Sequence, residues 1–348
     1  MDNFIIEPGE KILVTGANGF IGQKVIRALL TYGYTDIRCM TRKKESKNLE
    51  ALASESGASI QIFHGNLLSK DDCTKAAEGV SVIYHLAAGV GKSYAGCYLD
   101  SVLTTKNLLD AVFKAGTLKR FVNISTIAVY SNENIKKGGL FDESCPVDDR
   151  LLERHEAYTY AKFKQDELVL EYADKFDIPY VIVRPSVVFG PGKAKISARI
   201  ASDSLGIYLH LGLNNRIPLS YVDNCAEAIV LAGLKKGIEG QVFNICDDDL
   251  PRSRDFLKLY KQKVNRFFTL SVPHWMWFSF CSMWEKYSKW SEGQLPPVFN
   301  RRACSFYWKD HEYSNRKAKE MLGWQPAVPM PEALDRFFKY MKQNEETR

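Results

Sequence analysis

The sequence predicts an α/β protein in which a doubly wound parallel sheet is joined to a smaller, mixed C-terminal lobe. Three observations lead to this fold class. Short β-rich runs alternate with helical stretches in the first half of the chain, a glycine-rich loop follows the first run, and Gly, Pro and mixed segments take over after residue 192. Continuous apolar strands separated by helices are typical of a parallel sheet that is covered on both faces.

The order of the predicted elements sets the domain boundaries. Strands are expected at 11–15, 37–40, 60–63, 82–86, 121–125 and 180–184, with helices at 22–33, 70–79, 98–116 and from 156 onward. A further helix over 221–236 and a strand over 242–246 return to the sheet. We therefore expect residues 1–186 and 221–246 to form the sheet domain, and residues 187–220 and 247–348 to form a ligand-binding lobe beyond the carboxyl ends of the strands.

The composition excludes several classes of protein. The 348 residues are 45% hydrophobic and 25% charged, which is ordinary for a soluble globular protein. The formal charge of +6 is spread in short runs, so we expect a solvated surface and no nucleic-acid binding. The eight cysteines form no C-x-x-C pair, so we expect no metal site, no disulfide framework and reduced thiols. The start of the chain lacks the pattern of a secretory signal, which favours a cytoplasmic location.

One uncharged segment stands out in the C-terminal half. Residues 267–284, FFTLSVPHWMWFSFCSMW, contain no Asp, Glu, Lys or Arg. A membrane-spanning helix needs about 20 predominantly apolar residues, whereas Pro273, His274 and several serines interrupt this run. We expect a packed helix or a lid over an apolar pocket. The alternative is a helix that rests in the plane of a bilayer, because tryptophan favours membrane interfaces.

The glycine-rich loop TGANGFIG spans residues 15–22 and connects the first strand to the first helix. Gly16 permits the tight turn, Gly19 lets the backbone approach a pyrophosphate, and Gly22 allows close packing of helix on strand. The pyrophosphate would accept hydrogen bonds at the positive end of the helix. In this context the pattern predicts a dinucleotide-binding Rossmann domain, the alternative being a structural turn without a ligand.

The residues after the second and third strands bear on the type of dinucleotide. Arg42 and Lys43 stand where an acidic residue would hold a ribose diol, and basic residues there accommodate a 2′-phosphate. NADP(H) is therefore favoured over NAD(H), unless the basic run is only a solvated turn. Asn66 ends the third strand and is expected to reach the adenine edge, with an ordinary Asn turn as the alternative.

Two tyrosines compete for the role of acid/base in the segment EAYTYAK, residues 156–162. On a helix Tyr158 and Lys162 lie on one face, whereas Tyr160 and Lys162 point different ways. A free tyrosine has a pKa of about 10, and nearby positive charges, from Lys162 and from an oxidised nicotinamide, are expected to lower it. Tyr158 is therefore the candidate for proton transfer to and from a hydroxyl. The alternative is that both tyrosines only pack.

A hydroxyl that orients the substrate oxygen is expected at the end of the fifth strand, in NISTIAVY. Ser125 and Thr126 both carry one. Successive strand residues face opposite ways, so only one of the two can point into the pocket. The pattern alone does not choose between them.

These residues resemble the extended short-chain dehydrogenase/reductase family, which includes NAD(P)-dependent epimerases and dehydratases of nucleotide sugars. The motifs TGANGFIG, VIYHLAA, TTKNLLDA, RFVNISTIAVY, YTYAK, RPSVVFGPG, YVDNCAEAI, VFNI and SNRKAKEMLGW occur in family order across nearly the whole chain. The resemblance implies that Tyr158 is the proton-transferring base, that Lys162 holds the nicotinamide ribose and that Thr126 is the orienting hydroxyl.

The resemblance also implies a set of contacts to the cofactor. His85, Leu86 and Ala87 would contact it through their backbone, so that His85 need not be catalytic. The residues expected to bind the cofactor are Gly16, Asn18, Gly19, Phe20, Ile21, Gly22, Arg42, Lys43, Asn66, Leu67, Leu86, Ala87, Ala88, Tyr158, Lys162, Pro185 and Val188.

Departures from the family pattern reduce the number of reactions that the protein is expected to catalyse. The stretch after Thr126 reads IAVY, without the acidic pair that sugar 4,6-dehydratases place there, which argues against dehydration. Ser101 replaces the usual Asn of the helix, and Ser131 replaces the Gly of VYG. We expect an oxidoreductase or epimerase that acts on a hydroxyl carbon of a nucleotide-activated sugar, and a homodimer is the expected assembly.

Two other functions stay open. The C-terminal tail also resembles 3β-hydroxysteroid and sterol dehydrogenases, which makes an apolar alcohol the alternative substrate. A dinucleotide-sensing protein without turnover is the third alternative, although it would not need the proton-transfer residues. A nucleotide sugar would be bound by Ser125, Arg216 and Arg301 or Arg302, whereas a sterol would need a dry wall such as Trp275, Trp277, Phe278 and Phe280.

Overall fold

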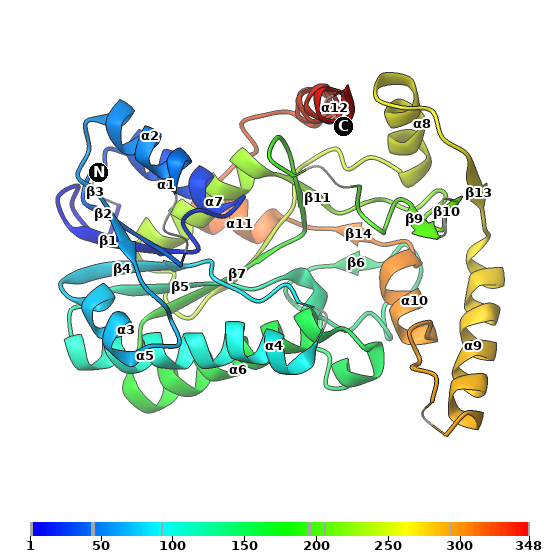
Figure 1. Cartoon of the computed structure of the whole chain (residues 1–348), viewed down its shortest axis with the longest axis horizontal. Coiled ribbons are helices and arrows are strands. Elements are labelled where there is room, and N and C mark those ends of the chain that lie inside the picture. The colour runs from blue at the N-terminus through cyan, green and yellow to red at the C-terminus, as the bar shows by residue number, and fades with distance from the viewer. Residues whose placement is uncertain are drawn as a thin grey trace.

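The chain folds around a seven-stranded parallel sheet with helices on both faces, as the computed structural model shows for residues 3–42, 46–91, 93–193, 196–204, 207–292 and 294–346 (Figure 1). The strand order is β12-β7-β5-β4-β1-β2-β3, and every pairing within it is parallel. The strands are β1 (Lys11–Thr15), β2 (Ile37–Thr41), β3 (Ile60–His64), β4 (Val80–His85), β5 (Arg120–Ile124), β7 (Tyr180–Pro185) and β12 (Val242–Ile245). The predicted fold class is thereby confirmed.

One helical layer covers the upper face of the sheet in Figure 1. Ile12, Val14 and Val82 of the strands pack there against Val25 of α1 and Ile229 of α7 in one buried cluster. Because both faces of these strands are buried, apolar residues occupy successive positions along them. The elements of this layer are α1 (Gly22–Thr31), α2 (Lys47–Ser56), α7 (Val222–Leu234) and α11 (Arg316–Leu322).

The second layer covers the opposite face. Leu13, Ile83 and Phe121 point into it and pack against Leu108 of α5 and Val169 of α6. This layer holds the long helix that carries the tyrosine pair. Its elements are α3 (Lys70–Ala77), α4 (Tyr94–Tyr98), the π-helical turn η1 (Leu99–Leu103), α5 (Thr104–Ala115) and α6 (Ala157–Phe176).

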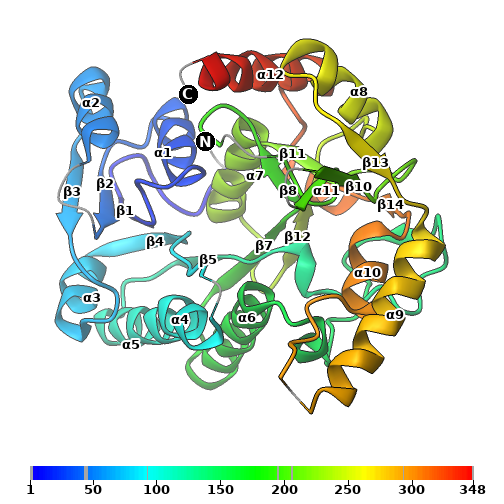
Figure 2. The same ribbon diagram turned by 45° about the vertical axis from the view of Figure 1, so that its right-hand side comes forward.

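The smaller lobe lies beyond the carboxyl ends of the strands, on the right in Figure 1 and towards the viewer in Figure 2. Phe256, Tyr260, Phe337 and Phe338 form the centre of its core. Its helices are α8 (Ser253–Lys263), α9 (His274–Trp290), α10 (Arg301–Trp308) and α12 (Met330–Glu346). Its strands are β6 (Leu140–Phe141), β8 (Val187–Phe189), β9 (Ser202–Ser204), β10 (Ile207–His210), β11 (Leu219–Tyr221), β13 (Thr269–Ser271) and β14 (Glu312–Tyr313).

The C-terminal part of the chain contributes to the upper helical layer as well as to the smaller lobe. Ala318 and Leu322 of α11, with Trp324 just after it, are buried in the same cluster as α1 and α7. The indole Nε1 of Trp324 donates to Asn224 O at 3.0 Å. The predicted division into two domains remains a prediction, and this packing ties residues 316–324 to the sheet.

The uncharged segment 267–284 contributes β13 and most of α9. Figures 1 and 2 show α9, in gold, at the edge of the molecule with α10 beside it. No helix within the described parts of the chain is long and apolar enough to cross a membrane.

Candidate active site

The glycine loop turns sharply between β1 and α1. Gly16 has a φ of +66°, which L side chains rarely adopt, and a Cβ there would lie 2.9 Å from Ala87 N. A Cβ on Gly22 would lie 2.3 Å from Gly16 O, so this glycine packs against its own loop as well as starting the helix. Ile21 precedes α1 and offers its start no side-chain hydrogen bond. This geometry fits a pyrophosphate, whose oxygens would accept from the first turn of α1.

Other predicted cofactor residues stand near the same edge. Leu86 directly follows β4, and its N–H donates to Thr15 O at 3.3 Å, so the chain leaves β4 beside the glycine loop. Ala87 and Ala88 continue from there, and Pro185 closes β7 while Val188 lies in β8. Asn18 contacts α1 through its carbonyl oxygen, which accepts from Gln23 Nε2 at 3.1 Å. Phe20 and Leu67 are in the hydrophobic clusters on either face.

Arg42 follows β2 directly, as expected from the sequence, and Lys43 lies outside the described residues. The Arg42 side chain is exposed, and its Nη1 lies 3.2 Å from Asp100 Oδ1. Such an exposed ion pair stabilises little, so the guanidinium is available to an anion.

The structure favours the turn interpretation for Asn66. Its Oδ1 accepts from Leu68 N at 3.1 Å, and its own N–H donates to Asp72 Oδ2 at 2.8 Å. The side-chain oxygen is therefore used within the loop that starts α3, which is what an Asn turn does.

Tyr158 and Lys162 both lie on α6, one turn apart. Tyr158 is in the first turn and half-buried, while Lys162 is almost completely buried. Lys162 Nζ donates to Ile124 O at 2.6 Å and to Gln165 Oε1 at 2.8 Å. An ammonium group has three donors, so one N–H remains for a further acceptor such as a ribose hydroxyl. The bond to Ile124 also brings Lys162 to the end of β5, two residues before Thr126.

Burial is the largest influence on the pKa values of Tyr158 and Lys162. It raises the pKa of Tyr158 to about 12, with smaller contributions from Asp166 and Cys97. It also lowers the pKa of Lys162 to about 8, although Asp166 opposes this change. The expectation that Lys162 and an oxidised nicotinamide together lower the pKa of Tyr158 stays a prediction, and burial of the phenol opposes it.

A buried hydrogen-bond chain, which sequence reasoning missed, links Lys162 to the glycine loop. Gln165 Nε2 donates to Thr105 Oγ1 at 2.7 Å, and this hydroxyl donates to Ser101 O at 2.6 Å. Thr105 Oγ1 also lies 2.8 Å from His85 Nε2. Because its single proton goes to Ser101, Thr105 must accept from His85, which places the imidazole proton on Nε2.

The other side of His85 completes this chain. Nδ1 is then an acceptor, and Thr15 Oγ1 donates to it at 2.8 Å. The Thr15 oxygen in turn accepts from Ala87 N at 3.3 Å. Burial and the charge of Lys162 lower the pKa of His85 to about 3, so it is neutral near pH 7 and not an acid/base. The resemblance likewise implied that His85 is not catalytic.

The two hydroxyls at the end of β5 face different surroundings. Ser125 is 3% exposed, and its Oγ donates to Asp166 Oδ2 at 2.7 Å. Asp166 also accepts from Asn123 Nδ2 at 2.8 Å and from Arg184 Nη2 at 3.0 Å. The expectation that Ser125 binds substrate is therefore not supported, because its hydroxyl is committed to this buried carboxylate.

Thr126 lies on the opposite side of the strand end. It is half-buried, and its Oγ1 accepts from Ala128 N at 3.2 Å, capping the turn η2 (Ile127–Val129). This turn packs against α6, which carries Tyr158. Of the two candidates, Thr126 is the one left to face a ligand.

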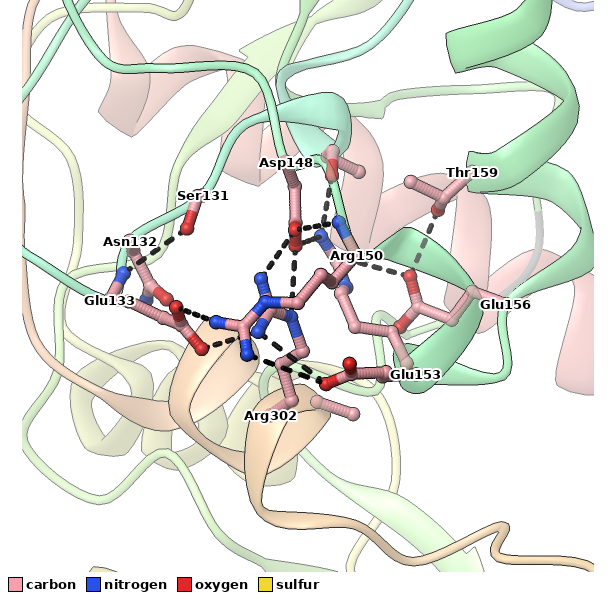
Figure 3. A network of polar contacts seen from close by, with 12 residues as sticks. Ser131, Asn132, Glu133, Asp148, Arg150, Glu153, Glu156, Thr159 and Arg302 are labelled. Atoms are coloured by element: carbon pink, nitrogen blue, oxygen red, sulfur yellow. Dashed lines mark hydrogen bonds and ion pairs between the residues drawn. The ribbon is translucent and has the colours of Figure 1, made fainter.

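A polar network surrounds the start of α6 (Figure 3). Arg154 Nη2 and Thr159 Oγ1 donate to Glu156 Oε2 at 2.8 and 2.9 Å, which fixes this carboxylate two residues before Tyr158. Arg302 binds Asp148 and Glu133 and is only 9% exposed. The sequence carried no signal for these partners, because Arg302 and Asp148 are more than 150 residues apart.

The arginines expected to bind a diphosphate are all engaged by carboxylates. Arg216 Nη1 lies 2.9 Å from Glu312 Oε1, and Arg301 Nε lies 2.8 Å from Glu285 Oε2. These two pairs are partly exposed, so an incoming anion can compete for their guanidinium groups. Arg302, by contrast, is held in the buried network.

A cavity of about 530 Å³ opens between α9, α10 and the segment before α6. Its lining includes His155, three residues before Tyr158, and the apolar side chains of Phe278 and Pro297. Three carboxylates from Glu133, Glu153 and Glu285 face it. Five cationic residues also line it, namely Arg150, Lys289, Arg301, Arg302 and Lys309. No cluster of His, Cys, Asp and Glu in the described residues could hold a metal ion.

Comparisons with known proteins agree with this geometry. Residues 12–246 match the model of the NAD dependent epimerase/dehydratase family. Sterol-4-alpha-carboxylate 3-dehydrogenase (decarboxylating) of Mus musculus is 24% identical over 344 residues, covering 95% of this chain and 91% of the relative. The enzyme of that name from Homo sapiens is 23% identical over 340 residues, covering 94% and 87%.

Solved structures share the fold over nearly the whole chain. The structure of gox2253 superposes with a TM-score of 0.77 at 22% identity, covering 97% of this chain and 99% of that one. UDP-glucuronic acid 4-epimerase from Bacillus cereus, in complex with NAD, gives a TM-score of 0.73 at 24% identity, covering 97% and 98%. The chain belongs to the NAD-dependent epimerase/dehydratase family, and it is an NAD-dependent enzyme of the extended short-chain dehydrogenase/reductase type.

Proposed function

We propose that the protein moves a hydride between a nicotinamide cofactor and a hydroxyl-bearing carbon, with Tyr158 as the proton-transferring group. The observation that carries this proposal is the arrangement of Tyr158 and Lys162 on one face of α6, at the end of β5 where Thr126 stands. The bound nicotinamide supplies the hydride acceptor or donor. Tyr158 would take or return the hydroxyl proton, Thr126 would orient the oxygen, and the free N–H of Lys162 would hold the ribose.

We further propose a nucleotide-activated sugar as the substrate. The cavity beside the start of α6 has five cations against three carboxylates, which suits an anion better than a neutral ring system. Arg301 lines this cavity, whereas Arg216 is kept as a candidate by its partly exposed pair with Glu312. The Bacillus cereus enzyme with a similar fold acts on UDP-glucuronic acid, which is in keeping with this class.

An apolar alcohol is the second candidate, because the sterol dehydrogenases match 95% of this chain. The aromatic wall expected for it is not formed in the described residues. Trp275 and Phe280 are exposed, and of the four aromatic residues only Phe278 lines the cavity. A sterol would therefore have to displace water from the charged side chains that line this cavity. Removing that water is unfavourable, because the charges lose their hydration.

A ligand panel distinguishes the two substrate classes. UDP-, GDP-, CDP- and dTDP-sugars and a set of hydroxysteroids are added, with NAD⁺ present throughout, and the thermal midpoint is measured. A ligand that binds only the folded state at about 100 times its Kd adds about 2.7 kcal/mol of stability. We expect a nucleotide sugar to raise the midpoint in the wild type and to do so less in Arg301→Ala. A shift with a steroid and none with any nucleotide would reject the sugar proposal.

A further inference from the structure

Helix α9 is firmly attached to the protein on one side only. Cys281 and Ser288 are buried, and the ring of Trp277 packs edge-on against Phe299 and Trp308, with centroids 5.6 and 6.1 Å apart. Trp284 Nε1 donates to Pro296 O at 3.1 Å. These contacts hold the inner face of α9 on α10 and on the segment that joins the two helices.

The outer face of α9 exposes large apolar side chains. Trp275 is 69%, Met283 68% and Trp290 76% exposed, and Met276 and Tyr287 are about half exposed. On a helix with 100° per residue these five positions fall within one third of the circumference. Phe268, just before β13, is also 70% exposed. An exposed apolar strip of this kind marks a surface that contacts a membrane or another protein.

The charges on and around the outer face are mainly positive. Lys286 is exposed within this third of the circumference, and Arg266 is exposed before β13, whereas the acidic residues between 264 and 292 are Glu285 and Glu292. Glu285 is directed inward, where its carboxylate binds Arg301 at 2.8 Å. The outer face therefore combines tryptophan, tyrosine and methionine with the exposed cation of Lys286, and Glu292 is exposed just beyond its C-terminal end.

We propose that the outer face of α9 docks on the surface of a bilayer that contains anionic phospholipid, with the helix axis parallel to the membrane. Trp and Tyr favour the headgroup region, and Lys286 on this face would meet lipid phosphates. The helix of 17 residues is about 25 Å long, enough to insert its apolar side chains along the interface. Lys286 favours an anionic surface over a second copy of the chain, because a symmetric contact through this face would bring the two Lys286 side chains together.

The docking surface and the cavity lie on different sides of α9. Phe278, Glu285, Ser288 and Lys289 line the cavity, and none of them belongs to the outer face defined above. Docking would thus leave the cavity open to substrate. The inference does not depend on the identity of that substrate, so it can fail or succeed separately from the proposed function.

Vesicle co-sedimentation tests the proposal with the full chain. We expect binding to phosphatidylcholine vesicles with about 30% phosphatidylglycerol, and a loss of about tenfold or more in the partition constant for Met283→Glu/Trp290→Glu. Arg266→Gln/Lys286→Gln should weaken binding by about fivefold per cation removed, only on the anionic vesicles. Phe113→Glu, on exposed α5 away from α9, is the matched control and should bind as the wild type does. Circular dichroism checks that each variant is folded.

Two further measurements make the outcome decisive. Brominated phosphatidylcholine should quench tryptophan fluorescence in the wild type and less in Trp290→Phe, which keeps the fold and an apolar side chain. The oligomeric state is measured in parallel by light scattering, since a homodimer is also expected. If no vesicle binds and Met283→Glu/Trp290→Glu converts a dimer into a monomer, the outer face is a subunit interface and the membrane proposal is wrong.

Discussion

At the scale of single residues, the two tyrosines of YTYAK differ in what surrounds them. Tyr160 packs edge-on against Tyr94, with ring centroids 5.7 Å apart, and Lys164 Nζ lies 5.8 Å from its ring centroid. Tyr158 shares its helix face with Lys162, which is anchored to the end of β5. The two phenols are thus separated by the geometry of α6, although they are only two positions apart in the sequence.

Tyr158→Phe is expected to remove most turnover. A general acid/base contributes about 10²- to 10⁴-fold, so kcat should fall by that factor while the Kd for NADH, measured by fluorescence, changes little because the glycine loop is intact. Tyr160→Phe is the matched control and should keep near wild-type kcat. Loss of turnover in Tyr160→Phe with Tyr158 intact would contradict the assignment. Turnover absent from the wild type itself, with cofactor bound, would favour the sensor alternative.

At the scale of elements, the sheet was predictable because its strands are buried on both faces. Phe121, Val122 and Ile124 of β5 are all buried, and this gives the continuous apolar run that marks a parallel strand. Helix α2 was not among the expected helices, because within KNLEALASES only Leu49 and Leu52 are large and apolar. Its buried leucines pack on the sheet, and this tertiary contact stabilises a helix that the local sequence pattern does not predict.

The site was predictable to the extent that it depends on local spacing. Tyr158, Lys162 and the glycines follow from positions within one turn or one loop. The commitment of Ser125 to Asp166 depends on a contact between residues 41 apart, and the pKa of Tyr158 depends on burial. Neither a long-range contact nor desolvation is visible in a local pattern. Asn66 shows a third case, because the same local sequence fits both a contact to adenine and an Asn turn.

The residues at the end of β2 are those expected to choose between NAD(H) and NADP(H), and here the sequence and the family point to different cofactors. NAD is the cofactor of the matched family, whereas Arg42 stands exposed after β2 with no acidic residue beside it in sequence. We propose that Arg42 and Lys43 allow NADP(H) to bind. Charge-assisted hydrogen bonds contribute about 1.5 to 3 kcal/mol each, so Arg42→Ala/Lys43→Ala should weaken NADP(H) at least about tenfold more than NAD(H).

Calorimetric titration of both dinucleotides against both proteins checks this prediction. Asp100→Asn is a useful companion, because it releases Arg42 from its ion pair without removing the guanidinium. It should leave NADP(H) binding intact or slightly stronger. Equal affinities for NAD(H) and NADP(H) before and after the double substitution would assign the basic run to the solvated surface.

At the scale of the whole molecule, folding buries Lys162, the cation that we propose holds the nicotinamide ribose, where its charged form is disfavoured. Lys162 is buried between β5 and α6, and the chain of Gln165, Thr105, His85 and Thr15 extends from it to the glycine loop. Every member of this chain is satisfied, which is the condition under which a buried polar network rigidifies a core. The sheet thus joins the cofactor loop and the reacting helix through one set of directional bonds.

The cost of burying Lys162 should be measurable as a pH dependence of stability. Its pKa is about 8 in the folded protein, against the ordinary value of 10.5 for a lysine, which applies to the unfolded chain. Between these values the unfolded chain retains a proton that the folded protein has released. The unfolded state therefore binds more protons, and the free energy of unfolding rises with pH across this window, by at most about 1.4 kcal/mol per unit. Below about pH 8 Lys162 is protonated in both states and adds no slope.

Lys162→Met isolates this contribution, because the other titrating groups are common to both proteins. Urea unfolding at a series of values from about pH 7 to about pH 10.5 gives the free energy of unfolding of each. The wild-type value minus the variant value should be flat below about pH 8 and should increase above it. A difference that stays flat over the whole range would show that Lys162 titrates alike in the folded and unfolded states. The buried ammonium would then not be destabilised by the site that uses it, and the hydrogen bonds to Ile124 and Gln165 would fully replace its lost hydration.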